Sequence, residues 1–392
     1  MTAPSSARVD PRSAGAAPRG ETGRPGSRHG GGRRAGSPRG IRRGIHGNQA
    51  AAGWLFVLPV IVILGVFMLV PVLMALWVSV SDWGGRGSPL SPNVGFVGLE
   101  NYAAVTADGG LPTRDFGIAL RNNAWYVLLV VPLQTALSLF LALLVNRAIL
   151  RGRGFFRTAF YFPSVTSSVA ITVLWLFLFS SSGVVNTVLS WIGITGPNWF
   201  NDPSGVVHNV LGAVGIDSGP AFLTGGGFLG ITWWDWLAGP SVAMSAFVLM
   251  AVFTTSGTFM LLFLAGLQNI GGETEEAAMV DGASSWQRFW RVTLPQLKPV
   301  LFTVLTLGLI GCWQVFDQIY TGTQGGPSKT TLTPAYLSYQ AAFGSQDWGQ
   351  GAAIAFMLFA IIVFFTIVQR IVLRDRPVSA RRARQYQVRQ QP

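Results

Sequence analysis

The chain has 392 residues, of which 50% are hydrophobic and only 11% are charged, and its mean hydropathy is +0.43. A soluble domain carries about a quarter charged residues, so this composition excludes a soluble protein and indicates an integral membrane protein. The net charge of +12 does not indicate nucleic-acid binding, because ten of the 28 Lys and Arg residues precede residue 50 and seven follow residue 369. Basic ends that flank a membrane region are typical of contact with anionic lipid headgroups.

Cofactor and nucleotide chemistry have little support in this composition. Cys312 is the single cysteine, and the three histidines show no spacing typical of metal ligands, so no metal site is predicted. Only two lysines occur, Lys298 and Lys329, and neither follows the glycine that a phosphate-binding P-loop requires. If ATP drives this protein, we expect a second polypeptide to bind the nucleotide and its Mg²⁺.

The two ends of the chain differ from its middle. Residues 1–48 are rich in Gly, Ser, Pro and Arg, with almost no large apolar side chains, so they cannot bury a core and are predicted to form a disordered basic arm. No cleavable signal peptide is expected there. Residues 49–373 carry the apolar runs and are predicted to form a single membrane domain, followed by a basic tail at 374–392.

An uncharged run of about 20 apolar residues is long enough to cross a bilayer as a helix. Six runs approach or exceed this length: Trp54–Ser81, Asn122–Val145, Thr158–Ser182, Ser241–Ile270, Pro299–Phe316 and Gly351–Gln369. The fifth is short and is expected to extend to about Tyr320. The prolines inside several runs are tolerable, since neighbouring helices can satisfy the released backbone groups. The sequence therefore predicts an all-α membrane protein with six transmembrane helices.

The distribution of Arg and Lys predicts the orientation of these spans. The connection between the second and third spans and the loop at 271–298 are rich in positive charge, whereas the opposite loops hold little. Both termini and the 271–298 loop are therefore predicted to be cytoplasmic. The connection at 183–240 is then external, and it is expected to begin with a short interfacial helix at 183–189; an extra span or a re-entrant hairpin is the alternative for this stretch.

The loop between the fourth and fifth spans is a charged, helix-forming stretch between two apolar runs. Glu275 and Glu276 favour a helix start, Gly282 interrupts the helix, and Pro295 disfavours its simple continuation. We expect two short helices with a bend, the second carrying Trp286, Phe289 and Trp290. Because two small alanines, Ala277 and Ala278, let another surface approach the backbone, we expect this loop to meet a partner protein.

The spacing in this loop resembles the signature loop of binding-protein-dependent ABC import permeases. The matching residues are Glu276-Ala277-Ala278, Gly282, Val292 (usually Ile in that family) and Leu294-Pro295. In that family the loop forms coupling helices that dock into a groove on a cytoplasmic ATPase subunit. The resemblance therefore implies a coupling role here for Glu275, Glu276, Ala277, Ala278, Asp281, Gly282, Arg288, Leu294 and Pro295.

Further segments are similar to the carbohydrate branch of these permeases, in particular to the first maltose or glycerol-phosphate permease subunit. They are Leu264–Ile270, Asp281–Ala283, Phe316–Tyr320, Thr323–Pro327 and Gly349–Ala355. The resemblance implies the type I ABC importer permease fold, sugar as the solute, and a place in a bacterial plasma membrane. It also implies three kinds of partner: a second permease subunit, a dimer of ATPase subunits, and an external solute-binding protein.

A sugar path needs hydroxyl-bonding groups and flat aromatic faces in an apolar setting, and polar residues inside a membrane are costly enough to indicate function. Trp313, Gln314 and Asp317 lie within one and a half turns of the fifth span, and Asp317 is expected to share a face with each of the other two. Thr255 and Thr258 on the fourth span are further candidates. Alternatively, Gln314 and Asp317 hydrogen-bond between helices, Trp313 anchors at the outer interface, and the threonines bond their own helix.

Three other functions compete with sugar import. An importer of a non-sugar solute would keep the same mechanism. A secondary carrier driven by an ion gradient would need ionisable residues within its spans, where Asp317 is the only candidate. A membrane-embedded transferase would need clustered carboxylates or histidines near one membrane face, and the carboxylates here are scattered.

Overall fold

The protein is helical, and the computed structural model describes residues 47–146 and 152–373. The predicted arm lies outside the described residues except for Gly47 and Asn48, where helix α1 (Gly47–Leu64) begins, and the predicted tail at 374–392 lies outside them entirely. The chain divides into two compact units between Val62 and Ile63, so the described part of the first unit is most of α1.

Five stretches in the described part of the chain are helical, long and apolar enough to cross a membrane: Ala52–Ser79, Leu111–Asn146, Val242–Gln268, Lys298–Gly322 and Trp348–Val372. They correspond to five of the six predicted spans. The first consists of α1, a π-helical turn (Gly65–Leu69) and α2 (Val70–Ser79). Three of these stretches are single helices: α4 (Leu111–Asn146), α11 (Val242–Gln268) and α18 (Trp348–Val372).

The remaining predicted span, Thr158–Ser182, is not one continuous helix. It consists of α5 (Arg153–Val165) and α6 (Ser168–Leu178), which are bent by 97° at the break between them. Proline and several hydroxyl side chains precede the break, and such hydroxyls offer the backbone alternatives to helical hydrogen bonds. Thr166 illustrates this, because its hydroxyl donates to the carbonyl of Phe162 at 3.1 Å. The hydroxyl of Ser164 instead donates to the carbonyl of Thr254 on α11 at 2.6 Å.

The fifth span is also interrupted. Helix α15 (Lys298–Trp313) ends before Gln314, and the short helix α16 (Asp317–Gly322) begins three residues later. The backbone at Phe316 has φ −136° and ψ −58°, which is outside the helical region. Non-helical backbone at membrane depth is tolerated only where it is buried in protein or lines a water-filled cavity. The break therefore marks this position as a candidate for solute contact.

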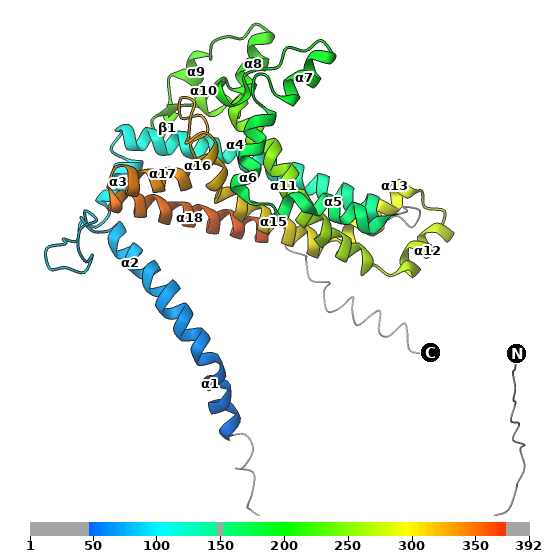
Figure 1. Ribbon diagram of the computed structural model, residues 1–392, viewed down its shortest axis with the longest axis horizontal. Helices are drawn as coiled ribbons and strands as arrows, with labels where there is room; N and C mark the ends of the chain where they lie inside the picture. The colour runs from blue at the N-terminus through cyan, green and yellow to red at the C-terminus, as the bar shows by residue number, and fades with distance from the viewer. Residues whose placement is uncertain (1–46, 147–151, 374–392) are drawn as a thin grey trace, which may run out of the picture. The chain divides into compact units, whose positions relative to one another are not determined.

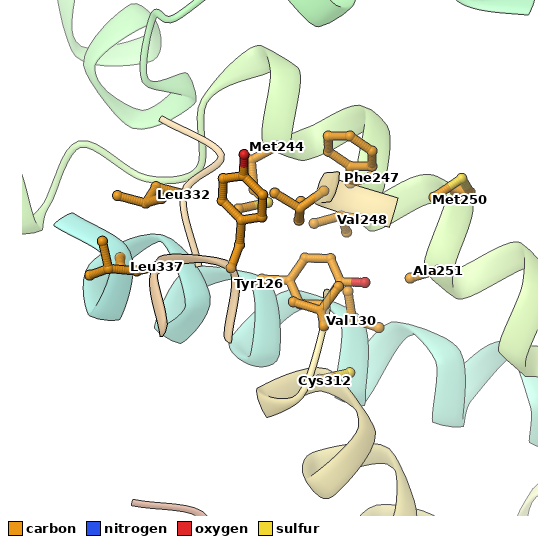
Figure 2. Close-up of a cluster of buried hydrophobic side chains, with 14 of the residues drawn as sticks. Tyr126, Val130, Met244, Phe247, Val248, Met250, Ala251, Cys312, Leu332 and Leu337 are labelled. Carbon is orange, nitrogen blue, oxygen red and sulfur yellow. The ribbon is translucent and has the colours of Figure 1, made fainter. Parts of the chain in front are cut away.

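The core of the membrane domain forms between α4 and α11, as Figure 2 shows for Tyr126 and Val130 on one side and Met244 and Phe247 on the other. All four side chains are buried. Cys312, near the end of α15, belongs to the same buried cluster. Since lipid is as apolar as a leucine side chain, close van der Waals packing rather than the hydrophobic effect stabilises such contacts.

Short elements form the region predicted to be an external loop. They are α7 (Val184–Trp191), a 3-10 turn (Trp199–Asn201), α8 (Val206–Ala213), α9 (Ala221–Thr224), the antiparallel strands β1 (Gly227–Phe228) and β2 (Ile231–Thr232), and α10 (Trp233–Trp236). Helix α7 confirms the short helix predicted at 183–189. Each of these elements has at most eight residues, too short to cross a bilayer. Figure 1 shows them gathered in one place, at the top of the view.

Hydrogen bonds attach the segment between α16 and α17 (Pro334–Tyr339) to the first half of α4. Helix α3 (Glu100–Thr106) packs against α4 and α18. The buried amide of Asn122 donates to the carbonyls of Lys329 and Leu332, at 2.8 and 3.0 Å. The ammonium group of Lys329 also pairs with Asp115 at 2.7 Å, but the lysine side chain is half-exposed. The amide therefore contributes more to this attachment than the ion pair does.

We expect Asn122→Ala to lower the free energy of unfolding by about 1–3 kcal/mol, because the buried carbonyl of Leu332 and the part-buried carbonyl of Lys329 lose their donor. Lys329→Met should cost at most about 1 kcal/mol, since exposed ion pairs contribute little. Unfolding of the purified variants in mixed detergent micelles measures both. Equal losses for the two variants would contradict this ranking.

Candidate functional site

The loop that resembles a coupling segment forms two short helical pieces with a bend, as predicted. Helix α12 (Gly272–Val280) is followed by Gly282, whose φ of +77° lies in the left-handed region. The second piece consists of α13 (Ser285–Arg288), a π-helical turn (Phe289–Thr293) and α14 (Leu294–Gln296). Ser284 caps this piece reciprocally with Gln287, which fixes the new helix start directly after the bend. The roles inferred for these residues remain predictions.

Pro295 does not end the second piece. The preceding π-helical turn lets the amide of Leu294 bond the carbonyl of Phe289, five residues back, so the chain turns through the proline without a regular helical bond. Leu297 follows and is fully buried. It packs against α11 where Gly266 leaves room, because a Cβ at Gly266 would lie 3.0 Å from the Leu297 side chain. The segment is thus attached to the membrane helices at its end.

The surface of this segment, which we call the coupling surface, exposes apolar side chains. Val280 is 87% exposed and Trp286 is 70% exposed, and the rings of Trp286 and Trp290 lie 5.4 Å apart. Exposed apolar groups of this size at a helix bend are typical of a protein–protein contact. A hollow of about 900 Å³ adjoins them, and it brings together two of the predicted residues, Glu275 and Arg288. The other predicted coupling residues do not line it; Glu276, Ala277, Asp281 and Gly282 are exposed.

A second hollow, of about 320 Å³, lies at the break of the fifth span, and we call it the central hollow. It brings together three of the predicted substrate residues, Thr255, Gln314 and Asp317. Its lining comes from α4, α11, α15, the break after α15 and the start of α16: Tyr126, Val130, Gln134, Ala251, Thr254, Thr255, Phe259, Leu307, Gly308, Gly311, Cys312, Gln314, Val315, Phe316, Asp317 and Gln318. Figure 2 labels Tyr126, Val130, Ala251 and Cys312 of this lining as members of the buried apolar cluster.

Sequence reasoning missed Gln134, which lies on α4 and is fully buried. Its Oε1 accepts a hydrogen bond of 2.6 Å from the hydroxyl of Thr255, whereas its Nε2 has no partner among the described residues. A Cβ on Gly308 would collide with that Nε2. An amide inside the apolar run of the second span was the available signal, because polar groups there are costly.

Trp313 does not share a face with Asp317, so that expectation is wrong. The helix ends at Trp313, and the helical spacing on which the expectation depended does not continue to Asp317. The indole is 2% exposed and stacks on Phe365 of α18 with the ring centres 5.4 Å apart. Thr258 is exposed and does not line the central hollow either; its amide donates to Ser164 of α5.

We expect Trp313→Ala to lower the free energy of unfolding by about 3 kcal/mol or more, because it leaves a cavity between α15 and α18. Trp313→Phe keeps a ring against Phe365 and should cost clearly less. Unfolding in mixed detergent micelles measures both, and the concentration of solute that gives half-maximal uptake should be unchanged in Trp313→Phe. A raised value in that variant would return Trp313 to the solute path.

The central hollow can bind a neutral, hydroxyl-rich molecule. Amide, hydroxyl and carboxylate groups offer both donors and acceptors, and Tyr126 and Phe316 offer flat faces. Asp317 supplies the only carboxylate in the lining, so the hollow lacks the pair of carboxylates that acid–base hydrolysis of a sugar needs. The described residues contain no group of metal-binding side chains.

Comparison with known proteins identifies similar chains among membrane transport proteins. Residues 134–376 match the family described as the inner membrane component of binding-protein-dependent transport systems. The chain is 33% identical over 328 residues to the lactose transport system permease protein of Rhizobium radiobacter, covering 83% of this chain and 94% of that one. It is 32% identical to the trehalose/maltose transport system permease protein of Thermococcus litoralis, covering 84% and 95%.

Among solved structures, the fold is similar to a chain of a bacterial ABC transporter involved in the import of the acidic polysaccharide alginate. The TM-score is 0.61 at 19% identity, and the match covers 83% of this chain and 96% of that chain. A second structure of the alginate transporter, in complex with a periplasmic protein that holds an alginate pentasaccharide, gives a TM-score of 0.60. With the coupling-type loop and the helical membrane domain, these matches show that the chain belongs to the family of inner membrane components of binding-protein-dependent transport systems.

Proposed function

We propose that this chain is one half of the membrane channel of an ATP-driven sugar importer in a bacterial plasma membrane. The central hollow at the break of the fifth span carries the proposal, because it places amide, hydroxyl and aromatic groups together inside an otherwise apolar bundle. The sugar-transport names of the relatives support the same solute class.

In this proposal an external binding protein delivers the sugar, and a second permease subunit completes the channel. ATP and Mg²⁺ bind to a cytoplasmic dimer of ATPase subunits, which contacts the coupling surface. Alternating access then exposes the central hollow to one side of the membrane and afterwards to the other. The termini and the coupling surface are cytoplasmic. The residues of this chain bind, orient and release the sugar without covalent chemistry.

Two measurements test the proposal. Purification of the tagged chain in mild detergent should recover a second permease and an ATPase, and recovery of the chain alone under several gentle conditions would contradict it. Uptake by intact cells of labelled mono-, di- and oligosaccharides should identify a transported sugar, and deletion of the chain should abolish that uptake. Uptake that follows an ion gradient and survives ATP depletion would favour the carrier instead.

A further inference from the structure

A continuous chain of aromatic rings begins at the central hollow and leads away from it. We call it the aromatic ladder; its members are Phe316, Tyr320, Tyr336, Tyr339, Phe343, Trp348 and Trp83. Phe316 lines the hollow and lies 5.5 Å from Tyr320 and 5.4 Å from Tyr339 between ring centres. Tyr339 then contacts Phe343 at 5.0 Å, and Phe343 contacts Trp348 at 4.8 Å. Every step is thus a direct ring contact.

The ladder runs toward the end of the membrane domain opposite to the coupling surface. It follows α17, the π-helical turn Gln340–Gly344 and the start of α18, and it ends where Trp348 meets Trp83 at 5.5 Å. Figure 1 shows α17 beside the first turns of α18, whereas α12 and α13 lie at the other end. In the proposed orientation, the ladder therefore connects the external side with the central hollow.

Two rings of the ladder are exposed, Phe343 at 60% and Tyr320 at 43%. Phe316, Tyr339, Trp348 and Trp83 are partly exposed, and Tyr336, at 7%, is buried behind them. The rings of Tyr320 and Tyr339 lie 5.4 Å apart, and the interaction between their hydroxyl groups raises the pKa of Tyr339. The surface therefore combines flat apolar faces with hydroxyl groups that can donate and accept hydrogen bonds.

This combination fits a saccharide better than a lipid tail. The exposed side chains of α2 include Val72, Leu73 and Leu76, which are aliphatic, as a surface against lipid requires. The ladder instead carries three tyrosines, and polar residues adjoin it in the sequence: Asp317 and Gln318 next to Phe316 at the central hollow, and Gln340 next to Tyr339 in its middle. Tyrosine offers contact area at a low cost in conformational entropy, so a row of tyrosines suits a weak, repeated contact along a path.

We propose that the aromatic ladder binds the successive pyranose rings of an oligosaccharide, and guides the molecule from the external side into the central hollow. The inference rests on the proposed function, and it deepens it by naming the class of cargo, a chain of several sugar rings. One ring occupies the central hollow, where hydrogen-bonding groups are concentrated. The following rings stack along Tyr320, Tyr339 and Phe343.

The test is uptake by cells of a series of one to four rings, built from the ring and linkage of the sugar that the uptake panel identifies. In Tyr320→Ala and Phe343→Ala we expect uptake of the three- and four-ring members to fall about fivefold or more, while uptake of the shortest transported member stays within about twofold of wild type. Tyr320→Phe keeps the ring and should retain uptake of the whole series. Phe364→Ala is the matched control, since Phe364 is an equally exposed ring on α18 outside the ladder.

Three results would overturn the inference. The first is an equal loss of uptake for all members of the series in Tyr320→Ala and Phe343→Ala. The second is a wild type that takes up no member longer than one ring. The third is a disulfide between Tyr320→Cys and a cysteine of the second permease, which would place the ladder in a subunit interface. Failure of the proposed function looks different, because the wild type would then take up no saccharide at all.

Discussion

Replacement of Gly282 by valine will lower sugar uptake by at least about tenfold while leaving the membrane helices folded. Gly282 has a φ of +77°, and a left-handed conformation costs a residue with a Cβ about 1–2 kcal/mol, most for a β-branched one. Space is not the limit, because a Cβ at Gly282 would meet nothing within 4 Å. The valine therefore changes the turn between α12 and α13, and with it the geometry of the coupling surface, rather than the packing of the core.

The comparison with other substitutions makes this test specific. Asparagine tolerates the left-handed region, so Gly282→Asn should keep most of the uptake that Gly282→Val loses. Gly272 is the matched control: it lies in the same segment, has equally open space and lacks a positive φ, so Gly272→Ala should leave uptake unchanged. The ATPase recovered with the tagged chain should fall in parallel with uptake. Equal uptake by Gly282→Val and Gly282→Asn would show that uptake does not depend on the left-handed conformation at residue 282.

The bend of the coupling segment was predictable because a few local rules determine it. Glycine favours a left-handed turn, and Ser284 with Gln287 three residues later forms a capping box, so the position of both helices follows from short-range sequence. The positions of most spans followed from apolar length alone. These signals do not depend on which helices become neighbours.

The two broken spans could not be predicted in the same way. An apolar run gives the same length signal whether it forms one helix or two, and the 97° bend between α5 and α6 depends on contacts such as Ser164 with Thr254 of α11. The wrong expectation that Trp313 shares a face with Asp317 has the same origin, because a spacing of four residues places two side chains on one face only if the helix continues between them. Gln134 was overlooked because its position at the wall of the central hollow depends on its neighbour Thr255, 121 residues away in the sequence.

Replacement of Gln134 by leucine will lower sugar uptake strongly while hardly changing the free energy of unfolding. Its Nε2 has no partner among the described residues. The Thr255 hydroxyl has a single proton, and its oxygen lies 2.6 Å from both Gln134 Oε1 and the carbonyl of Ala251, so without the glutamine it bonds that carbonyl alone. Removal of the amide should therefore change the free energy of unfolding by about 1 kcal/mol or less, in line with the small average value of hydrogen bonds between membrane helices. Uptake should nevertheless fall at least about tenfold, because the sugar loses a buried donor at the wall of the central hollow.

Gln369 provides the control for this variant. It is a part-buried glutamine that also joins two helices, since its Nε2 donates to the hydroxyl of Thr306 at 3.0 Å, and its Oε1 has no partner in the described part of the chain. It does not line the central hollow. Gln369→Leu should thus affect unfolding to a similar degree and leave uptake at the wild-type level. If both variants lost uptake equally, the effect of Gln134→Leu would come from helix packing, and the unpartnered amide would have no specific part in binding sugar.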